Sequence, residues 1–177
     1  FAKTIGNSLT EAYRRAEAAE QRDCVYTFDV ATQKMIIFSD LHKGARDHAD
    51  DFQVAEQAYN AALGYYYETG HTLVGLGDVE ELWEERIHPV IKSYGYTLKL
   101  EGKFHQEKRY LRFWGNHDDD WKDPATVRNY LQDLYEGEPL VVREGLLIRL
   151  TNAGEPLGTL FMVHGHQGTV DSDTLAF

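Results

Sequence analysis

The stretch Phe113-Trp114-Gly115-Asn116-His117-Asp118 constrains this chain more than any other. An apolar strand end runs into a glycine turn, and an amide, an imidazole and a carboxylate follow in consecutive positions. Such side chains add nothing to an apolar core, because burying a polar group without a partner costs free energy. Metal-assisted chemistry can use all three of them. The stretch therefore predicts a strand whose end carries a functional site.

A second apolar run, Lys34–Ser39, suits a buried parallel strand and ends in Asp40-Leu41-His42. Side chains two apart in an extended chain point to the same side, so Asp40 and His42 can hold one divalent cation together. The simpler alternative is that Asp40 caps the next turn and His42 is an ordinary polar residue.

A helical pattern over 50–70 leads from that strand to another, Thr72–Leu76, which is followed by Gly77-Asp78 and by Glu81. Strand, helix and strand in this order form a right-handed parallel crossover, which brings both strand ends to one edge of the sheet. Ligands bind at that edge in open α/β sheets. A carboxylate such as Asp78 can bridge two cations there, although Gly-Asp alone is more typical of a turn.

The remaining elements follow from caps and turns. Ser8 opens a capping box before a surface helix over 11–21, and Asp123 with Pro124 starts another helix. One or two helices are expected between 80 and 109, with breaks near Pro89 and Gly95. Strands are expected over 109–114, 140–142, 146–150 and 159–163, with a hairpin turn at 152–155. The last strand ends in His164.

Aromatic residues gather in the predicted helical region and in the strand that follows it. They could line an apolar substrate groove or form a seam between helix and sheet, and we favour the seam because such stripes are usually core. They are Tyr94, Tyr96, Phe104 and Tyr110.

Composition narrows the class of protein. The 177 residues fit one domain, and 42% hydrophobic with 27% charged residues is ordinary for a soluble globular protein. A formal charge of −11 disfavours a nucleic-acid partner. The lone Cys24 excludes an intrachain disulfide and a cysteine-based zinc cluster. No apolar run is long enough to span a bilayer and the amino end is not signal-like, so we expect a cytoplasmic protein.

Four strand ends that carry Asp, His or Asn match a known pattern. Asp40-Leu41-His42, Gly77-Asp78-x-x-Glu81, Gly115-Asn116-His117-Asp118 and His164-Gly165-His166 resemble, in this order, the motifs of the calcineurin-like metallophosphoesterases. The resemblance covers residues 34–171. Ser39 before the first motif, Glu81, and the spacing of Arg109 and Arg112 before the third are most similar to the bacterial UDP-2,3-diacylglucosamine hydrolase-like branch.

The resemblance implies an α/β fold, a metallophosphoesterase-type αββα sandwich, with a dinuclear metal site at the carboxyl edge of the strands. Asp40 and His42 would hold the first metal, Asp78 would bridge, and Asn116 and His164 would hold the second. His117 would act as an acid or charge stabiliser, oriented by Asp118, with Glu81 in the second shell. Nitrogen and oxygen ligands suit two Mn, Fe or Zn ions, of which we favour Mn.

The family pattern closes with Gly-His-x-His, but Gly168 stands where the second histidine would be. We therefore expect a single domain over 1–177, with 1–33 as an N-terminal helical extension and the closing motif beyond Phe177. Arg46 and Arg86 are candidate substrate contacts. Lys43 and His48 fit a solvated loop better.

The expected activity is metal-dependent hydrolysis of a phosphoester or pyrophosphate bond, as in a phosphodiesterase. The substrate would be a small phosphoester or a nucleotide-diphosphate-linked molecule, and peripheral membrane association is compatible with the branch resemblance. The sequence leaves open a nucleotide or protein phosphatase, a noncatalytic scaffold of the same fold, and the oligomeric state.

Overall fold

The computed structural model describes residues 2–20, 25–48 and 50–168. The chain divides into two compact units, which we call the central unit (34–142) and the terminal unit (the described parts of 1–33 and 143–177). Cys24 and residues 169–171, the end of the span covered by the resemblance, lie outside the described residues.

The central unit is built on a sheet with the strand order β2-β3-β4-β5. β2 pairs with β3, and β3 with β4, in parallel, with Ile37 opposite Val74 and Val74 opposite Leu111. The predicted crossover is therefore confirmed, and three consecutive strands end at one edge of the sheet. The strands are β2 (Lys34–Phe38), β3 (His71–Leu76), β4 (Tyr110–Phe113) and β5 (Val142–Arg143).

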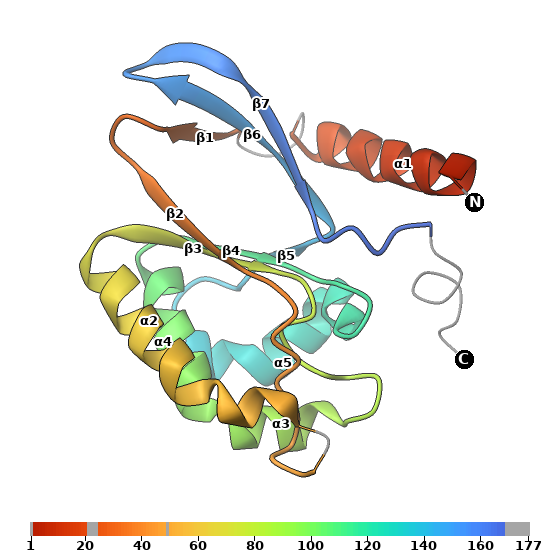
Figure 1. Cartoon of the computed structure of the whole chain (residues 1–177), viewed down its shortest axis with the longest axis vertical. Helices are drawn as coiled ribbons and strands as arrows, with labels where there is room; N and C mark the ends of the chain where they lie inside the picture. Colours follow the sequence, from red (N-terminus) through yellow and green to blue (C-terminus); the bar gives the residue numbers. More distant parts are fainter. Residues whose placement is uncertain (1, 21–24, 49, 169–177) are drawn as a thin grey trace. The chain divides into compact units, whose positions relative to one another are not determined.

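Helices of the central unit pack on one side of this sheet (Figure 1). Leu63, Leu73, Leu98 and Leu131 are fully buried in the core between helices and sheet. This side of the sheet is therefore closed by apolar packing. The elements are η1 (Asp51–Val54), α2 (Glu56–Glu68), α3 (Ile87–Ser93), α4 (Gly95–Gln106), η2 (Asp119–Lys122) and α5 (Pro124–Tyr135).

Two local predictions for these helices hold. Asp123 caps α5 by accepting hydrogen bonds from the backbone N–H groups of Ala125 (3.0 Å) and Thr126 (3.2 Å). Three of the four aromatic residues form the seam that we favoured, since Tyr94, Phe104 and Tyr110 are buried in the core. Tyr96 differs, because it is exposed.

The terminal unit contains α1 (Ala2–Glu20), β1 (Tyr26–Asp29), β6 (Gly145–Asn152) and β7 (Glu155–Val163). Its sheet has the order β1-β6-β7, with β1 and β6 parallel and the predicted β6–β7 hairpin antiparallel. α1 packs along β6 through the buried Ala12 and Ala16. The capping box at Ser8 is wrong, because α1 already begins at Ala2 and packing overrides the local signal.

The protein is thus of mixed α/β class, with parallel pairing in both units. In the part of the chain that the structure describes, no helix has both the length and the apolar character that crossing a membrane requires.

Candidate metal centre

The loops after β2 and β3 run side by side beyond the strands. The N–H of Asp40 donates to Gly77 O (3.2 Å), and the N–H of His42 donates to Asp78 O (2.9 Å). The loop after β4 joins them, because the N–H of Leu82 donates to His117 O (2.8 Å). Main-chain bonds therefore bring the three strand ends together before any side chain is considered.

Asp40, His42 and Asp78 adopt the left-handed backbone conformation, with φ values of 54°, 48° and 50°. This conformation costs a residue other than glycine about 1–2 kcal/mol. Backbone strain of this kind clusters at functional sites, where the surroundings force a side chain into one direction. Of the seven residues other than glycine with this conformation in the described chain, three are residues that the sequence predicts as ligands.

Three of these strand-end side chains, which we call the donor set, are His42, Asp78 and His117. Each offers a ligand atom, and the three atoms lie within 4.8 Å of one another. Asp78 Oδ1 accepts the backbone N–H of His117 (2.9 Å), while Asp78 Oδ2 lies 4.0 Å from His42 Nε2. An Asp40 oxygen is also within 4.8 Å of Asp78. Carboxylate oxygens with imidazole nitrogens suit a divalent transition metal.

Glu81 connects the two imidazoles of the donor set. Its Oε2 atom lies 3.1 Å from His42 Nδ1 and 2.6 Å from His117 Nδ1. Because an ionised carboxylate only accepts hydrogen bonds, each Nδ1 carries a proton in this arrangement. Both Nε2 atoms are then the ones available for a metal or a substrate. Carboxylates that accept the other ring N–H orient metal-binding histidines in this way.

The ring of His117 has two further neighbours. The indole of Trp83 stacks on it, with ring centroids 4.0 Å apart, and the His42 ring meets it edge-on at 4.5 Å. Trp83 is the contact of His117 that the sequence reading missed. Its position two residues after Glu81 is the only signal that could have suggested it.

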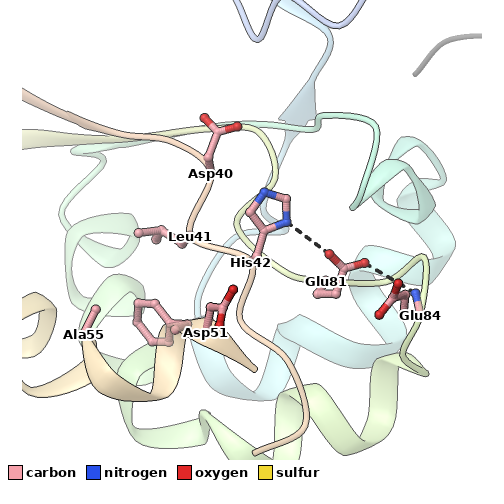
Figure 2. Close-up of a pocket in the computed structure, with 8 residues that line it drawn as sticks. Asp40, Leu41, His42, Asp51, Ala55, Glu81 and Glu84 are labelled. Atoms are coloured by element: carbon pink, nitrogen blue, oxygen red, sulfur yellow. Dashed lines mark hydrogen bonds and ion pairs between the residues drawn. The ribbon is translucent and has the colours of Figure 1, made fainter. Parts of the chain in front are cut away.

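A cavity of about 430 Å³ opens beside the donor set (Figure 2). Figure 2 shows the His42 imidazole turned toward Glu81, with Asp40 nearby. Leu41, Phe52 and Ala55 supply the apolar part of the wall. The full lining is Asp40, Leu41, His42, Asp51, Phe52, Ala55, Glu81 and Glu84.

Asp118 does not orient His117, contrary to the sequence prediction, because Glu81 occupies that place. The Asp118 carboxylate is fully buried and accepts hydrogen bonds from the backbone N–H groups of Asp78 (3.1 Å), Val79 (3.0 Å) and Gly115 (2.7 Å). Burial raises the pKa of Asp118, although the nearby positive charge of Arg112 acts in the opposite direction. Asp118 therefore holds the backbone of the loops after β3 and β4 in place.

The two predicted substrate contacts lie elsewhere. Arg46 Nη2 pairs with both carboxylate oxygens of Glu56 (2.7 and 2.6 Å), and its Nε donates to Ser93 O (3.0 Å). Its guanidinium thus ties loop to helix. Arg86 lines a different cavity, of about 530 Å³, with residues such as His88 and Tyr130.

Lys43 is not in a solvated loop either. Its side chain is fully buried and its Nζ lies 2.6 Å from Glu101 Oε1. The sequence pattern does not indicate where the Lys43 side chain points, because lysine combines an aliphatic chain with a terminal charge and fits a buried or an exposed position.

The remaining predicted ligands stand as follows. Asn116 lies half-buried in the bend after β4, next to His117. His164 follows β7 in the terminal unit, where its Nδ1 lies 3.2 Å from His166 Nδ1. The geometry also makes His117 a potential metal ligand, a role that the sequence reading did not give it. Comparisons of the chain with protein-family models, with curated proteins and with solved structures found no match.

Proposed function

We propose that this chain is a metal-dependent phosphohydrolase of the calcineurin-like metallophosphoesterase type, with the αββα sandwich of that family. The observation that supports the proposal most is the donor set: three consecutive parallel strands each end in one of its residues, and their ligand atoms lie within 4.8 Å of one another. Packing alone does not require His42, Asp78 and His117 to meet.

The proposed ligand assignment keeps Asp40 and His42 for one metal, Asp78 as the bridge, and Asn116 and His164 for the other. The nitrogen and oxygen donors fit Mn, Fe or Zn, and we favour Mn. When bound, such ions lower the pKa of water and offset charge on the phosphoryl oxygens. In the central unit, Asp78 has Asp40, His42 and His117 as neighbours, which fits a bridging position.

His117 is the residue that we assign to proton transfer. Its Nδ1–H donates a hydrogen bond to Glu81. Nε2 is therefore the atom that can hold a proton for the leaving oxygen of the substrate. General acid catalysis of this kind contributes about 10²–10⁴-fold to a rate. Stacking on Trp83 fixes the plane of the ring from which this proton would be delivered.

The cavity beside His42 has room for a small substrate. A volume of about 430 Å³ is in the range of small-molecule sites. We therefore propose a small phosphoester, or a nucleotide-diphosphate-linked molecule as in the branch that the sequence resembles most. Turnover of a panel of phosphomonoesters, phosphodiesters, nucleoside diphosphates and phosphopeptides separates this from a nucleotide or protein phosphatase.

The test of the proposed function is hydrolysis of bis-p-nitrophenyl phosphate by the chain with added Mn²⁺. His117→Ala should lower turnover at least a hundredfold, since a general acid is worth that much. Elemental analysis should still find the metal that Asp40, His42 and Asp78 hold in the assignment above, because His117 is not one of its ligands there. Equal turnover in wild type and variant would refute the acid role. Metal binding by the wild type without turnover of any panel substrate would instead indicate a noncatalytic scaffold.

A further inference from the structure

Behind the donor set, the central unit buries five charged side chains, each at most 1% exposed. Burying charges is costly even when they are paired, so a cluster of this size needs a reason beyond stability. We call it the buried charge network. Its members are Lys43, Glu80, Glu101, Arg112 and Asp118.

The contacts of the network run from loop to loop. Lys43, from the loop after β2, lies 3.2 Å from Glu80 Oε1 in the loop after β3, and 2.6 Å from Glu101 in α4. Arg112 of β4 binds Glu80 and, at 2.8 Å, Asp118 Oδ2 in the loop after β4. Each of the three loops that carry a donor residue thus also sends one charged side chain into the network.

Arg112 has room at the centre of this network because of a glycine. Gly75 of β3 is the register partner of Arg112 in β4. A Cβ atom at Gly75 would lie 3.2 Å from Arg112 Cδ and 3.0 Å from the Tyr110 hydroxyl. Any larger residue at that position of β3 would therefore crowd the arginine side chain.

Asp118 connects the buried charge network to the backbone of the neighbouring loops. Its two oxygens take the N–H groups of Asp78, Val79 and Gly115 as well as the guanidinium of Arg112. The carboxylate therefore fastens the left-handed Asp78 and its neighbour Val79 to the turn before His117. A shift of this carboxylate would move two members of the donor set relative to each other.

We propose that the buried charge network, through Asp118, is a positioning device that sets the spacing of the three strand-end loops and thereby the metal affinity of the donor set. Asp118 is a positioning residue, because it acts through the backbone of Asp78 and Gly115. The second half of this proposal, on metal affinity, rests on the proposed function; the first half, on loop spacing, does not.

Asp118→Asn tests the spacing without any metal. The amide keeps the shape of the side chain but loses the charge that Arg112 binds and one acceptor. Hydrogen exchange in the metal-free protein, read by NMR, should lose at least tenfold protection at the N–H groups of Asp78, Val79 and Gly115. The matched control is Tyr94→Phe, which removes another buried hydrogen bond to a carboxylate, the 2.6 Å bond to Asp50, outside the network. That variant should keep protection at all three sites.

A Mn²⁺ titration by calorimetry tests the effect on affinity. Losing a residue that orients metal ligands typically costs 10–100-fold in affinity. Asp118→Asn should therefore need 10–100 times more Mn²⁺, and turnover at saturating Mn²⁺ should return to within about threefold of wild type. Tyr94→Phe should keep the wild-type dissociation constant.

The outcomes separate the two proposals. Unchanged protection at Asp78, Val79 and Gly115 in Asp118→Asn would overturn the positioning role, whatever the enzyme does. A wild type without turnover would overturn the proposed function alone, since the exchange measurement needs neither metal nor substrate. If Asp118→Asn does not fold, Arg112→Lys takes its place with the same expected losses. It keeps the charge but loses the guanidinium, whose Nη2 binds both Glu80 and Asp118 and whose Nη1 binds the Tyr110 hydroxyl.

Discussion

Neighbouring residues of the same three loops serve two different groups. His42, Asp78 and His117 form the donor set, whereas Lys43, Glu80 and Asp118 point into the buried charge network. The side chains of His42 and His117 are 32% and 25% exposed, while the network residues are at most 1% exposed. Each of the three loops therefore contributes one side chain to the donor set and another to the buried charge network.

The two groups differ in how their charges are balanced. The network combines three carboxylates with a lysine and an arginine, so protein cations stabilise its anions. Burial alone would raise the pKa of Glu80, but the charges of Arg112 and Lys43 outweigh it and lower that pKa to about 2. The donor set combines one carboxylate with two imidazoles, a composition that binds divalent metals. The buried charge network is thus recognised by protein cations that offset its carboxylates, and the donor set by side chains that can coordinate a metal.

The largest effect should come from breaking the network. Glu80→Gln leaves Arg112 and Lys43 buried with one carboxylate fewer, and loss of one partner of a buried ion pair costs about 3–5 kcal/mol. Urea unfolding followed by circular dichroism measures this loss. Glu138→Gln, at a side chain that is 80% exposed, is the control and should unfold as the wild type does. A loss below 1 kcal/mol in Glu80→Gln would show that the network does not stabilise the fold.

A smaller effect should follow at Glu81, which belongs to the site and not to the network. In Glu81→Gln an amide N–H can face the Nδ1 protons of His42 and His117, so the preference for one tautomer is lost. Metal affinity should fall about 10–100-fold with little change in unfolding free energy. The same Mn²⁺ titration measures it, with Glu84→Gln in the same loop as control. Large destabilisation with unchanged affinity would place Glu81 in the network instead.

The sequence predicts the strand ends, but it does not predict which loop residues belong to the donor set and which to the buried charge network. Apolar runs locate β2, β3 and β4, and the crossover rule places their ends at one edge. β3 and β4 are buried along most of their length, but the prediction that β2 is buried is wrong, because Ile37 within it is 46% exposed. The start of α5 was equally accessible, since Asp123 and Pro124 act through local geometry alone.

The partners of Asp118 and Lys43 were not accessible in this way. Both residues directly follow a histidine of the donor set, and no side-chain pattern encodes which of two neighbours faces inward. For Lys43, the direction follows from the left-handed backbone at His42. Asp118 was consequently assigned to His117, where the structure has Glu81. The ion pair of Arg46 was not accessible for a related reason, because its partner Glu56 is ten residues away on another element.

Metal binding by Asp78→Asn tests the central claim most directly, because Asp78 is the member of the donor set that lies near Asp40, His42 and His117 alike. Calorimetric titration with Mn²⁺ should show binding to the wild type and a loss of at least a hundredfold in affinity in Asp78→Asn, as several kcal/mol of metal contact would require. Hydrolysis of bis-p-nitrophenyl phosphate should fall in parallel, with the unfolding free energy close to that of the wild type. Equal Mn²⁺ affinity in the two proteins, or no binding to the wild type, would contradict the assignment of these strand ends as a metal centre.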